Sequence, residues 1–340
     1  MRVLVALALT TATLFVATAS AHAASTLEQV RARGSLVCGV NVGVAGFSAP
    51  DNKGVYTGLD VDYCHALAAA VLGDPAKVRF VPTTYQTRFV LLQSGELDVL
   101  ARNVTITLTR ETSLGLAGVG VNFYDGQGFM VPRTSGITTA KGLEGASICV
   151  LPGSTTEQNL GDFARRNDIK IAPVILDSTD SMTQAYQSGR CDAMTTDASQ
   201  LAALLVSALR DPGANVILPE RVSKEPLGPL VRKGDEQWLM IAKYLLMAQI
   251  AAEELGITAA QVDAMRASAD PDVRRLLGVE PGLGKALGLE EDWAARAIKA
   301  SGNYGESFER NLGHGSRIGL DRGLNDLWTK GGLMYALPLR

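Results

Sequence analysis

The strongest constraint on this 340-residue chain is an alternation of short apolar runs with helical segments, which begins at Leu36. The run LVCGV at 36–40 predicts a strand. Residues 59–72 predict a helix, because apolar residues recur near the helical period and Gly73 follows as a stop signal. Such alternation is typical of α/β proteins. The first series, which continues through a strand at 77–81, therefore predicts one compact α/β lobe.

A second series of the same kind follows the extended segment 126–133 and predicts a second lobe. Its expected strands and helices lie at 146–151, 157–166, 172–176, 181–187, 191–196 and from 198 onward. The proline-rich segment 218–235 suits an extended return crossing. Two crossings between lobes would form a hinge.

The length of the chain also favours more than one hydrophobic core. We expect lobe 1 to comprise 24–128 and 222–260, and lobe 2 to comprise 129–221. The remainder, 261–340, is rich in helical periodicity and glycine, and we expect it to form a helical C-terminal extension packed on lobe 1.

Residues 1–23 have the pattern of a secretory signal peptide. Arg2 is the only charge before the apolar run 3–19, and Ala21, His22 and Ala23 form an A-x-A cleavage site. The alternative is a membrane span, but the run is at the short limit for one. We expect the mature chain to begin near Ala24.

The formal charge excludes one class of partner. It is −3, and it becomes −4 when the single charge of the leader, Arg2, is removed. A weakly acidic chain without a basic cluster lacks the electrostatic footprint that phosphate binding requires. Nucleic acid is therefore not an expected partner.

Four cysteines in an exported chain favour disulfides over metal ligands, and their spacing contains no CxxC. We favour the pairs Cys38–Cys64 and Cys149–Cys191, one in each half of the chain. Three pairings are possible from sequence, and four buried free thiols are the other alternative.

The segment RNVTITLTR at 102–110 offers three kinds of donor to a small anion: hydroxyl groups, backbone N–H groups and the guanidinium of Arg110. A guanidinium binds a carboxylate through two parallel, charge-assisted hydrogen bonds. Alternatively, Thr105, Thr107 and Thr109 are alternate residues of a half-exposed strand, and Arg110 is a solvated charge.

Two features of the second series complement this anion site. The turn PGSTTEQ at 152–158 opens a helix, whose first N–H groups attract anions, and Ser154 with Glu157 forms a capping box. Asp197 lies at the carboxyl end of a strand, where open α/β sheets place ligand-contacting residues. It could also simply cap the next helix. A cation and an anion held apart match a zwitterion such as an α-amino acid.

Catalytic and metal sites find little support in the sequence. Of three histidines, His22 leaves with the leader, and His65 and His314 lack HExxH or similar spacing. No GxSxG elbow or GxGxxG fingerprint occurs. We expect no metal and no cofactor.

Taken together, these segments resemble the periplasmic solute-binding proteins of polar amino acid ABC transporters, and in particular the general L-amino acid-binding subgroup. The resemblance is carried by GVNVGVAGFSAPD (39–51), YTGLDVDYC (56–64), LQSGELDVLARN (92–103), FYDGQGFM (123–130), GRCDAMTTD (189–197), SKEPLGP (223–229) and GNYGESFERN (302–311).

The resemblance implies specific roles in binding the ligand. Asn103 and Thr105 match positions that hold the ligand, and Arg110 matches the arginine that clamps its α-carboxylate. Thr155 matches the residue whose N–H binds the same carboxylate, and Asp197 matches the aspartate that takes the α-ammonium.

The ligand side chain is expected to contact a further set of residues. Where relatives place aromatic rings against it, this chain resembles them only in Phe47 and has the aliphatic residues Val44 and Leu59 at two matching positions. We therefore expect a wider, less shape-selective pocket.

The resemblance further implies the two-lobed type II periplasmic-binding-protein fold with a two-segment hinge. The expected function is binding of an L-amino acid in the periplasm and its delivery to an inner-membrane ABC permease by a protein that is not an enzyme and acts as a monomer. The alternative is a periplasmic dehydratase-like enzyme on the same scaffold, which would need a general acid that we do not find.

Overall fold

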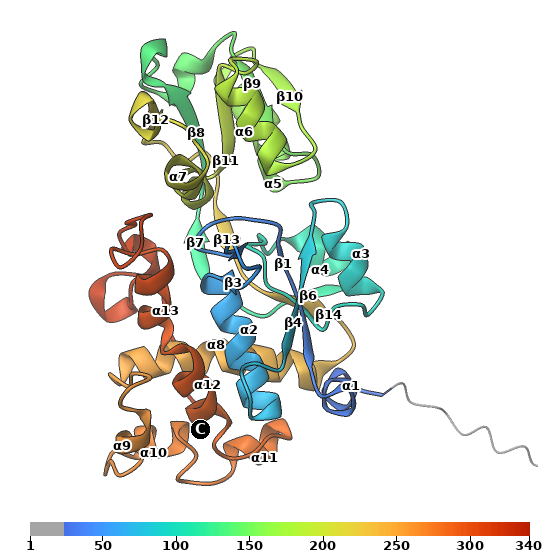
Figure 1. Cartoon of the computed structure of the whole chain (residues 1–340), viewed down its shortest axis with the longest axis vertical. Helices are drawn as coiled ribbons and strands as arrows, with labels where there is room; N and C mark the ends of the chain where they lie inside the picture. The colour runs from blue at the N-terminus through green and yellow to red at the C-terminus, as the bar shows by residue number, and fades with distance from the viewer. Residues whose placement is uncertain (1–23) are drawn as a thin grey trace, which may run out of the picture.

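The computed structural model describes residues 24–340, and the expected signal peptide at 1–23 lies outside this range. Two lobes stand one above the other and are joined by a narrow pair of strands (Figure 1). Each lobe is built on its own five-stranded sheet. The predicted two-lobed α/β fold is therefore confirmed.

The sheet of lobe 1 has the order β4-β1-β5-β14-β6. Strand β1 runs parallel to both of its neighbours, β4 and β5, whereas β14 returns antiparallel to β5 and β6. The strand bounds are β1 Leu36–Asn41, β4 Val78–Thr83, β5 Val99–Leu100, β6 Leu116–Gly118 and β14 Leu230–Arg232. The helices are α1 Thr26–Arg33, α2 Leu59–Leu72, α3 Arg88–Gln93, α4 Leu108–Ser113 and α8 Glu236–Glu254, and β2 Ala49–Pro50 pairs with β3 Tyr56–Thr57.

The sheet of lobe 2 has the order β10-β9-β11-β8-β12. Its strands are β8 Gln127–Pro132, β9 Ser147–Val150, β10 Ala172–Ile175, β11 Ala193–Asp197 and β12 Asn215–Ile217. Its helices are α5 Thr155–Asn167, α6 Thr179–Gln187 and α7 Ala198–Ser207. Because β8 starts at Gln127, this sheet begins two residues before the expected boundary at 129.

Two short antiparallel strands cross between the lobes: β7, Phe123–Asp125, pairs with β13, Glu225–Leu227. Each strand leads directly from one sheet to the other, since β8 follows β7 and β14 follows β13. A two-stranded ribbon is the only regular structure between the two sheets among residues 24–340 (Figure 1). This arrangement suits the predicted two-segment hinge.

The C-terminal residues pack against lobe 1. They form α9 Val262–Met265, α10 Pro271–Leu276, α11 Leu283–Leu287, α12 Trp293–Ser301 and α13 Tyr304–Asn311. Helix α12 lies along α2, and both α12 and α13 contact α8. Short 3₁₀ helices lie at Arg133–Ser135, Ala140–Leu143, Pro212–Ala214, Gly323–Asn325 and Trp328–Lys330.

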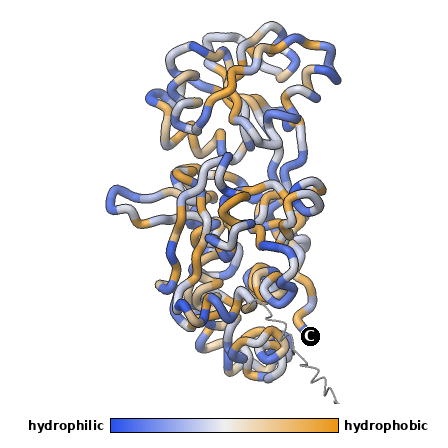
Figure 2. The backbone as a smooth tube through the Cα atoms, turned by 90° about the vertical axis from the view of Figure 1, so that its right-hand side faces the viewer, coloured by the Kyte–Doolittle hydropathy of each residue, from blue (hydrophilic) through white to orange (hydrophobic). Residues whose placement is uncertain are grey.

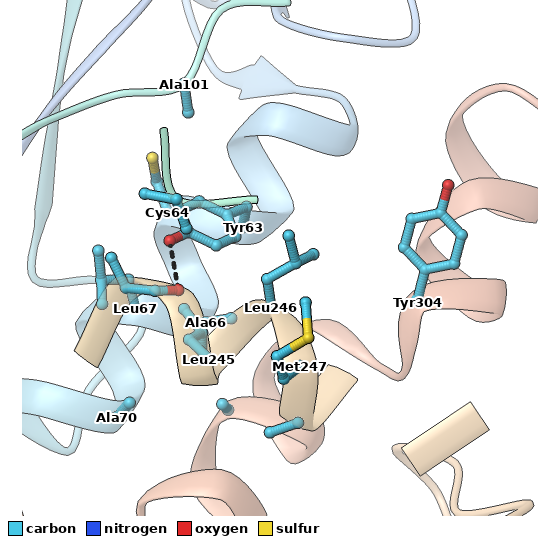
Figure 3. Close-up of a cluster of buried hydrophobic side chains, with 14 of the residues drawn as sticks. Tyr63, Cys64, Ala66, Leu67, Ala70, Ala101, Leu245, Leu246, Met247 and Tyr304 are labelled. Atoms are coloured by element: carbon cyan, nitrogen blue, oxygen red, sulfur yellow. Dashed lines mark hydrogen bonds between the residues drawn. The ribbon is translucent and has the colours of Figure 1, made fainter. Parts of the chain in front are cut away.

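Each lobe has its own buried core, and segments made of hydrophobic residues lie in the interior of both lobes (Figure 2). In lobe 1, α2 packs on α8, and the hydroxyl of Tyr63 donates a hydrogen bond to the Ala242 carbonyl at 2.9 Å (Figure 3). A buried tyrosine usually finds such a partner. The contact fixes α2, whose first turn carries Asp60 toward the cleft side of the lobe.

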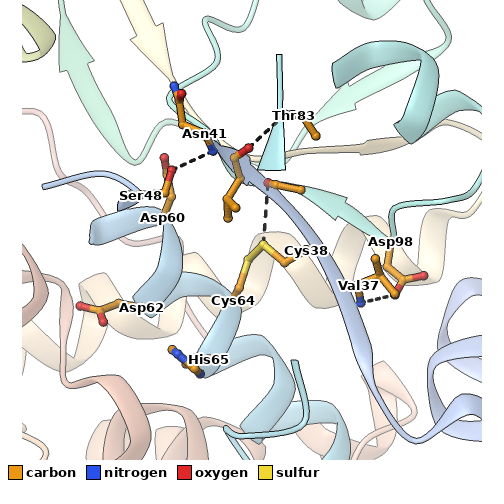
Figure 4. Close-up of a disulfide and its surroundings, with 12 residues drawn as sticks. Val37, Cys38, Asn41, Ser48, Asp60, Asp62, Cys64, His65, Thr83 and Asp98 are labelled. Atoms are coloured by element: carbon orange, nitrogen blue, oxygen red, sulfur yellow. Dashed lines mark hydrogen bonds between the residues drawn. A yellow bond between two sulfur atoms is a disulfide. The ribbon is translucent and has the colours of Figure 1, made fainter. Parts of the chain in front are cut away.

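Each lobe also contains one disulfide. Cys38 in β1 bonds to Cys64 in α2 (Figure 4), and Cys149 in β9 bonds to Cys191, just before β11. These are the two pairs favoured by the sequence. The first bond ties β1 to α2, the second ties β9 to the start of its neighbouring strand β11, and neither crosses between the lobes.

Residues 24–340 contain neither a candidate membrane span nor a candidate metal cluster. None of the helices in this range has the length and apolarity needed to cross a membrane. The same residues contain no group of three or more histidine, cysteine, aspartate or glutamate side chains that could hold a metal ion.

Asp60, on α2, gives a pH prediction. It is 1% exposed and accepts hydrogen bonds from the Asn103 N–H at 2.8 Å and the Asn122 side chain at 3.3 Å. Burial raises the pKa of this carboxyl from 3.8 to about 6, although these bonds and the charge of Arg102 oppose the rise. The folded state therefore holds a proton that the unfolded state releases, so stability falls as pH rises through this window.

We expect Asp60→Asn to remove this dependence. Relative to the variant, the wild-type protein should lose roughly 3 kcal/mol of unfolding free energy as pH rises from below 3.8 to above 6. Urea denaturation at several pH values checks this, because all other titrating groups are shared by the two proteins. Parallel curves for the two proteins would contradict the assignment.

Candidate functional site

A small cavity lies between the lobes and is lined by both. Its residues from lobe 1 are Tyr85, Arg88, Asn103, Val104, Thr105 and Arg110, and those from lobe 2 are Ser154, Thr155, Thr156 and Asp197. The free volume is about 20 Å³, close to the space one water molecule needs. A ligand as large as an amino acid can enter only if the lobes separate, so the hinge is needed for access.

Arg110 is held firmly at this cavity. Its backbone N–H donates to the hydroxyl of Thr107, which caps α4, and its Nη1 donates to the Thr105 carbonyl at 2.5 Å. Its guanidinium carbon lies 5.1 Å from the centre of the Phe89 ring. The side chain is 8% exposed and forms no ion pair among the described residues. A fixed, buried cation with free donors is suited to gripping a carboxylate.

The threonine-rich segment is not a strand: residues 102–107 form a loop, and α4 begins at Leu108. Only Thr105 makes a single bridge, with Leu227 of the hinge. Asn103 has a φ of 44°, a left-handed conformation that asparagine tolerates better than most residues. Its N–H is bound by Asp60, and its Oδ1 accepts from Asn41 at 3.1 Å. These bonds fix the loop against the floor of the cleft.

Across the cleft, α5 points its N-terminus into the cavity. Its cap is Ser154, whose hydroxyl accepts from the Glu157 N–H at 3.1 Å, and Thr155 is its first residue. The Glu157 carboxylate accepts from the N–H of Gly153 at 2.9 Å. The first N–H groups of a helix have no partner within the helix. The N–H of Thr155 can therefore serve an anion from lobe 2.

Asp197 also faces this cavity, and it does not cap α7. It stands at the N-cap position, yet its side chain makes no capping hydrogen bond. The cap is supplied by Asp125 of β7, whose Oδ2 accepts from the Ser199 N–H at 3.1 Å and the Ser199 hydroxyl at 2.5 Å. Because Asp125 supplies the cap of α7, the carboxylate of Asp197 is not used for capping and can contact a ligand.

The electrostatic environment of Asp197 favours binding a cation. Burial raises the pKa of this carboxyl well above its usual value, and the negative charges of Asp125 and Glu225 raise it further. Arg110 and Arg88 oppose the rise. An ammonium group in the cavity would stabilise the ionised carboxylate by the same Coulomb interaction.

Three residues expected at the ligand side chain do not line this small cavity. Val44, Phe47 and Leu59 are buried in the core of lobe 1 and do not line the cavity. The ring of Phe47 packs edge-on against Phe123, with centroids 5.3 Å apart, and Phe123 stacks on Phe308 of α13 at 6.1 Å. Phe123 therefore joins the ring of Phe47 to the C-terminal extension, and the distance of these segments in sequence left no signal of the packing.

Sequence reasoning missed Glu225 of β13, which lies between the two lobes. The residue is 1% exposed. Its Oε2 accepts from the hydroxyls of Thr105 at 2.6 Å and Thr155 at 2.9 Å, and its Oε1 accepts from Asn159 at 2.7 Å and Ser223 at 2.6 Å. One hinge carboxylate therefore bonds a residue of lobe 1 and two residues of lobe 2.

These contacts give a prediction about closure. Glu225→Gln removes the charge and replaces one acceptor by a donor, so at least one charge-assisted bond between the lobes is lost. Such a bond contributes about 2 kcal/mol, so ligand affinity should fall roughly 30-fold. Small-angle scattering of the ligand-free protein should also report a larger radius of gyration. The control is Glu236→Gln, an exposed residue of α8. If Glu225→Gln behaves like this control, the carboxylate does not hold the lobes together.

Comparison with known proteins agrees with this geometry. Residues 36–261 match the model of the bacterial extracellular solute-binding proteins, family 3. A glutamate/glutamine/aspartate/asparagine-binding protein of Rhodobacter capsulatus is 54% identical over 323 residues, which is 95% of each chain. A general L-amino acid-binding periplasmic protein of Rhizobium johnstonii is 51% identical, again over 95% of each chain.

A solved structure is similar over almost the whole length. It is a periplasmic binding protein of an ABC transporter from Brucella ovis with glutathione bound, 51% identical to this chain. The match covers 94% of this chain and all of that one, with a TM-score of 0.92. The resemblance found in the sequence is thus confirmed, and this chain belongs to the bacterial extracellular solute-binding proteins, family 3.

Proposed function

We propose that this protein binds an L-α-amino acid in the cleft between its lobes and delivers it to an inner-membrane ABC permease. The observation that carries the proposal is that a buried arginine of lobe 1, Arg110, and a buried aspartate of lobe 2, Asp197, line the same small cavity without an ion-pair partner among the described residues. The relatives named above are amino acid-binding proteins, which supports the same function.

In this proposal each lobe supplies part of the site. Arg110 grips the α-carboxylate, together with Asn103 and Thr105 of the fixed loop. When the lobes close, the N–H of Thr155 reaches the same carboxylate and Asp197 receives the α-ammonium. Micromolar binding corresponds to about −8 kcal/mol. That affinity requires both ligand charges to be paired, because an unpaired buried charge costs several kcal/mol.

The dehydratase alternative has no support among the relatives, since those named above are binding proteins and not enzymes. A binder holds one equivalent of ligand unchanged. Incubating the pure protein with its ligand and following the ligand by chromatography should therefore give no product beyond the amount of protein.

Export and oligomeric state complete the proposal. We infer that 1–23 is removed during secretion, that the mature chain begins at Ala24 in the periplasm, and that the protein acts as a monomer. The apolar run followed by an A-x-A site supports cleavage. Intact mass spectrometry of the periplasmic protein tests the first statement, and light scattering coupled to size exclusion tests the last.

The function itself is tested by identifying the ligand. Mass spectrometry of small molecules released from the purified mature protein should find an α-amino acid or a compound that contains one. A thermal-shift screen of the twenty amino acids on ligand-stripped protein should raise the melting temperature for one subset of them. No shift with any compound carrying an α-amino acid group would contradict the proposal.

A further inference from the structure

The C-terminal extension reaches the hinge strand β7 through the side chain of Asn325. This residue ends the 3₁₀ helix Gly323–Asn325, which contacts β7, and it is only 4% exposed. Its Oδ1 accepts from the Tyr124 N–H at 2.6 Å, and its Nδ2 donates to the Tyr124 carbonyl at 3.1 Å. The side-chain amide therefore pairs with both polar backbone groups of the middle residue of β7, as a neighbouring strand would.

The opposite edge of the hinge ribbon is held by lobe 1 at the same level. Tyr124 pairs with Pro226 of β13, and the Pro226 carbonyl accepts from the Ile106 N–H at 2.8 Å. Proline has no N–H, so Tyr124 and Pro226 cannot exchange two ladder bonds, and the polar groups of Tyr124 are available to Asn325. The Tyr124–Pro226 pair is thus fastened on both edges, by the extension and by the loop before α4.

The extension that carries Asn325 is itself fixed to lobe 1. The two Nη atoms of Arg322 each donate to the Glu253 carboxylate of α8 at 3.1 Å, and its Nε donates to the Asn325 carbonyl at 2.9 Å. The Tyr304 hydroxyl of α13 donates to the Asn122 carbonyl, just before β7, at 2.9 Å. A guanidinium–carboxylate pair with two parallel bonds is among the stronger polar contacts in proteins. We therefore expect Asn325 to move with lobe 1.

One residue further along the ribbon, contacts with lobe 2 begin. Asp125 accepts from Ser199 of α7, and its strand partner Glu225 accepts from residues of both lobes. Gly126 follows Asp125, and glycine adopts a wider range of backbone angles than other residues. The ribbon thus passes from lobe 1 to lobe 2 directly after the pair that Asn325 and Ile106 fasten.

We propose that Asn325 is a positioning residue for ligand binding, which clamps β7 to lobe 1 and so directs the closure that brings Asp197 onto the ligand. Asn325 does not line the ligand cavity, so it acts through the hinge. With Tyr124 held, bending is confined to Asp125 and the residues after it, and Asp125 supplies the cap of α7 beside Asp197. The effect on affinity rests on the proposed function, whereas the clamp itself does not.

The clamp favours binding because it preorganises the hinge. A strand with one free edge samples more conformations than a strand paired on both edges, and closure must then order it. Restricting that freedom before the ligand arrives lowers the cost of closure. The gain is common to all ligands, because Asn325 lies outside the cavity. A purely structural role predicts a different pattern, in which stability falls but the affinity of the folded protein stays unchanged.

The clamp is tested first in the wild-type protein without any ligand. Amide hydrogen exchange of the ligand-stripped mature protein, followed by NMR, should show the Tyr124 N–H exchanging as slowly as the amides of β1 in the sheet of lobe 1. Exchange at the rate of an unprotected amide would show that the bond to Asn325 does not persist in solution, and this result overturns the inference.

The variants are Asn325→Ala and Asn325→Leu, which both remove the two bonds to Tyr124, while leucine also keeps the volume of the side chain. The control is Asn311→Ala. It removes a bond from the same extension to Asp62 of α2, at 2.6 Å, and leaves the hinge untouched. Thermal melting establishes whether each variant folds, and calorimetry measures the affinity for L-glutamate, L-glutamine, L-aspartate and L-asparagine.

Both Asn325 variants should speed exchange of the Tyr124 amide by about tenfold or more, and should weaken binding of every amino acid that binds the wild type by about tenfold, because two buried hydrogen bonds are lost. Asn311→Ala should leave both quantities at their wild-type values. Unchanged affinity in the Asn325 variants, or an equal loss in Asn311→Ala, overturns the inference.

Two further outcomes remain decisive. If the Asn325 variants do not fold, the exchange rate of Tyr124 in the wild-type protein still decides whether the clamp exists. Wild-type protein that binds no amino acid overturns the proposed function, while the same exchange rate separately supports or overturns the clamp.

Discussion

Arg110→Ala should weaken binding of the amino acid at least about a hundred-fold, which is the largest loss that we expect from any single substitution. The guanidinium is buried, fixed by the Thr105 carbonyl and the Phe89 ring, and without an ion-pair partner in the described part of the chain. Truncating one partner of a buried charge pair costs 2–5 kcal/mol or more, because the other charge is left unpaired. Isothermal titration of ligand-stripped protein measures this loss directly.

The matched control for this prediction is Arg166→Ala, on the exposed face of α5. Its affinity should equal that of the wild type. The thermal melting of ligand-free Arg110→Ala should remain cooperative, since the variant removes no core contact between strands. An affinity for Arg110→Ala within a few-fold of the wild type would show that the ligand carboxylate is held elsewhere.

Asp197→Asn should have a comparable effect through the opposite charge of the ligand. Asparagine keeps the shape of the side chain but leaves the buried ammonium without a counter-ion, so affinity should fall about a hundred-fold. A ligand analogue without the amino group should bind the wild type poorly and should lose no further affinity in the variant. If the amino acid and this analogue lose affinity equally, Asp197 does not contact the ammonium.

The same residue predicts a pH dependence with a definite sign. Burial, Asp125 and Glu225 raise the pKa of Asp197, while Arg110 and Arg88 oppose the rise. Because the ammonium binds the ionised carboxylate, protons compete with the ligand. Affinity should therefore decrease as pH falls through the raised pKa of the ligand-free protein, and this decrease should be absent in Asp197→Asn.

The lobes were predictable from sequence because each depends on local patterns. The periodicity and glycine stop at 59–73 predict α2, which is observed at Leu59–Leu72 with Gly73 in the left-handed conformation. The capping signal of Ser154 and Glu157 predicts the start of α5 within two residues. Arg110 and Asp197 could be proposed as ligand contacts because Arg110 ends the threonine-rich segment 102–110 and Asp197 directly follows the predicted strand 191–196.

The rest depends on contacts between distant segments. Asp125 caps α7 by accepting from Ser199, 74 residues later, and nothing near Asp197 in the sequence indicates that another carboxylate supplies this cap. In the sequence, Glu225 is only one residue of the return crossing. Its bonds to Thr105 of lobe 1 and Thr155 of lobe 2 are evident only in the structure. The ring of Phe47 packs on Phe123, which in turn stacks on Phe308 of the C-terminal extension, and nothing near Phe47 in the sequence indicates this packing. Neither the hydrophobic periodicity nor the composition of a segment indicates such contacts between distant residues.

The most direct test of the central claim, that the two lobes pair opposite charges of one ligand, is a crystal structure of the mature protein with its amino acid bound. We predict a closed cleft in which the α-carboxylate contacts Arg110 and the N–H of Thr155, and the α-ammonium contacts Asp197. A ligand bound in the reverse orientation, or outside the cavity that Arg110 and Asp197 share, would contradict the claim.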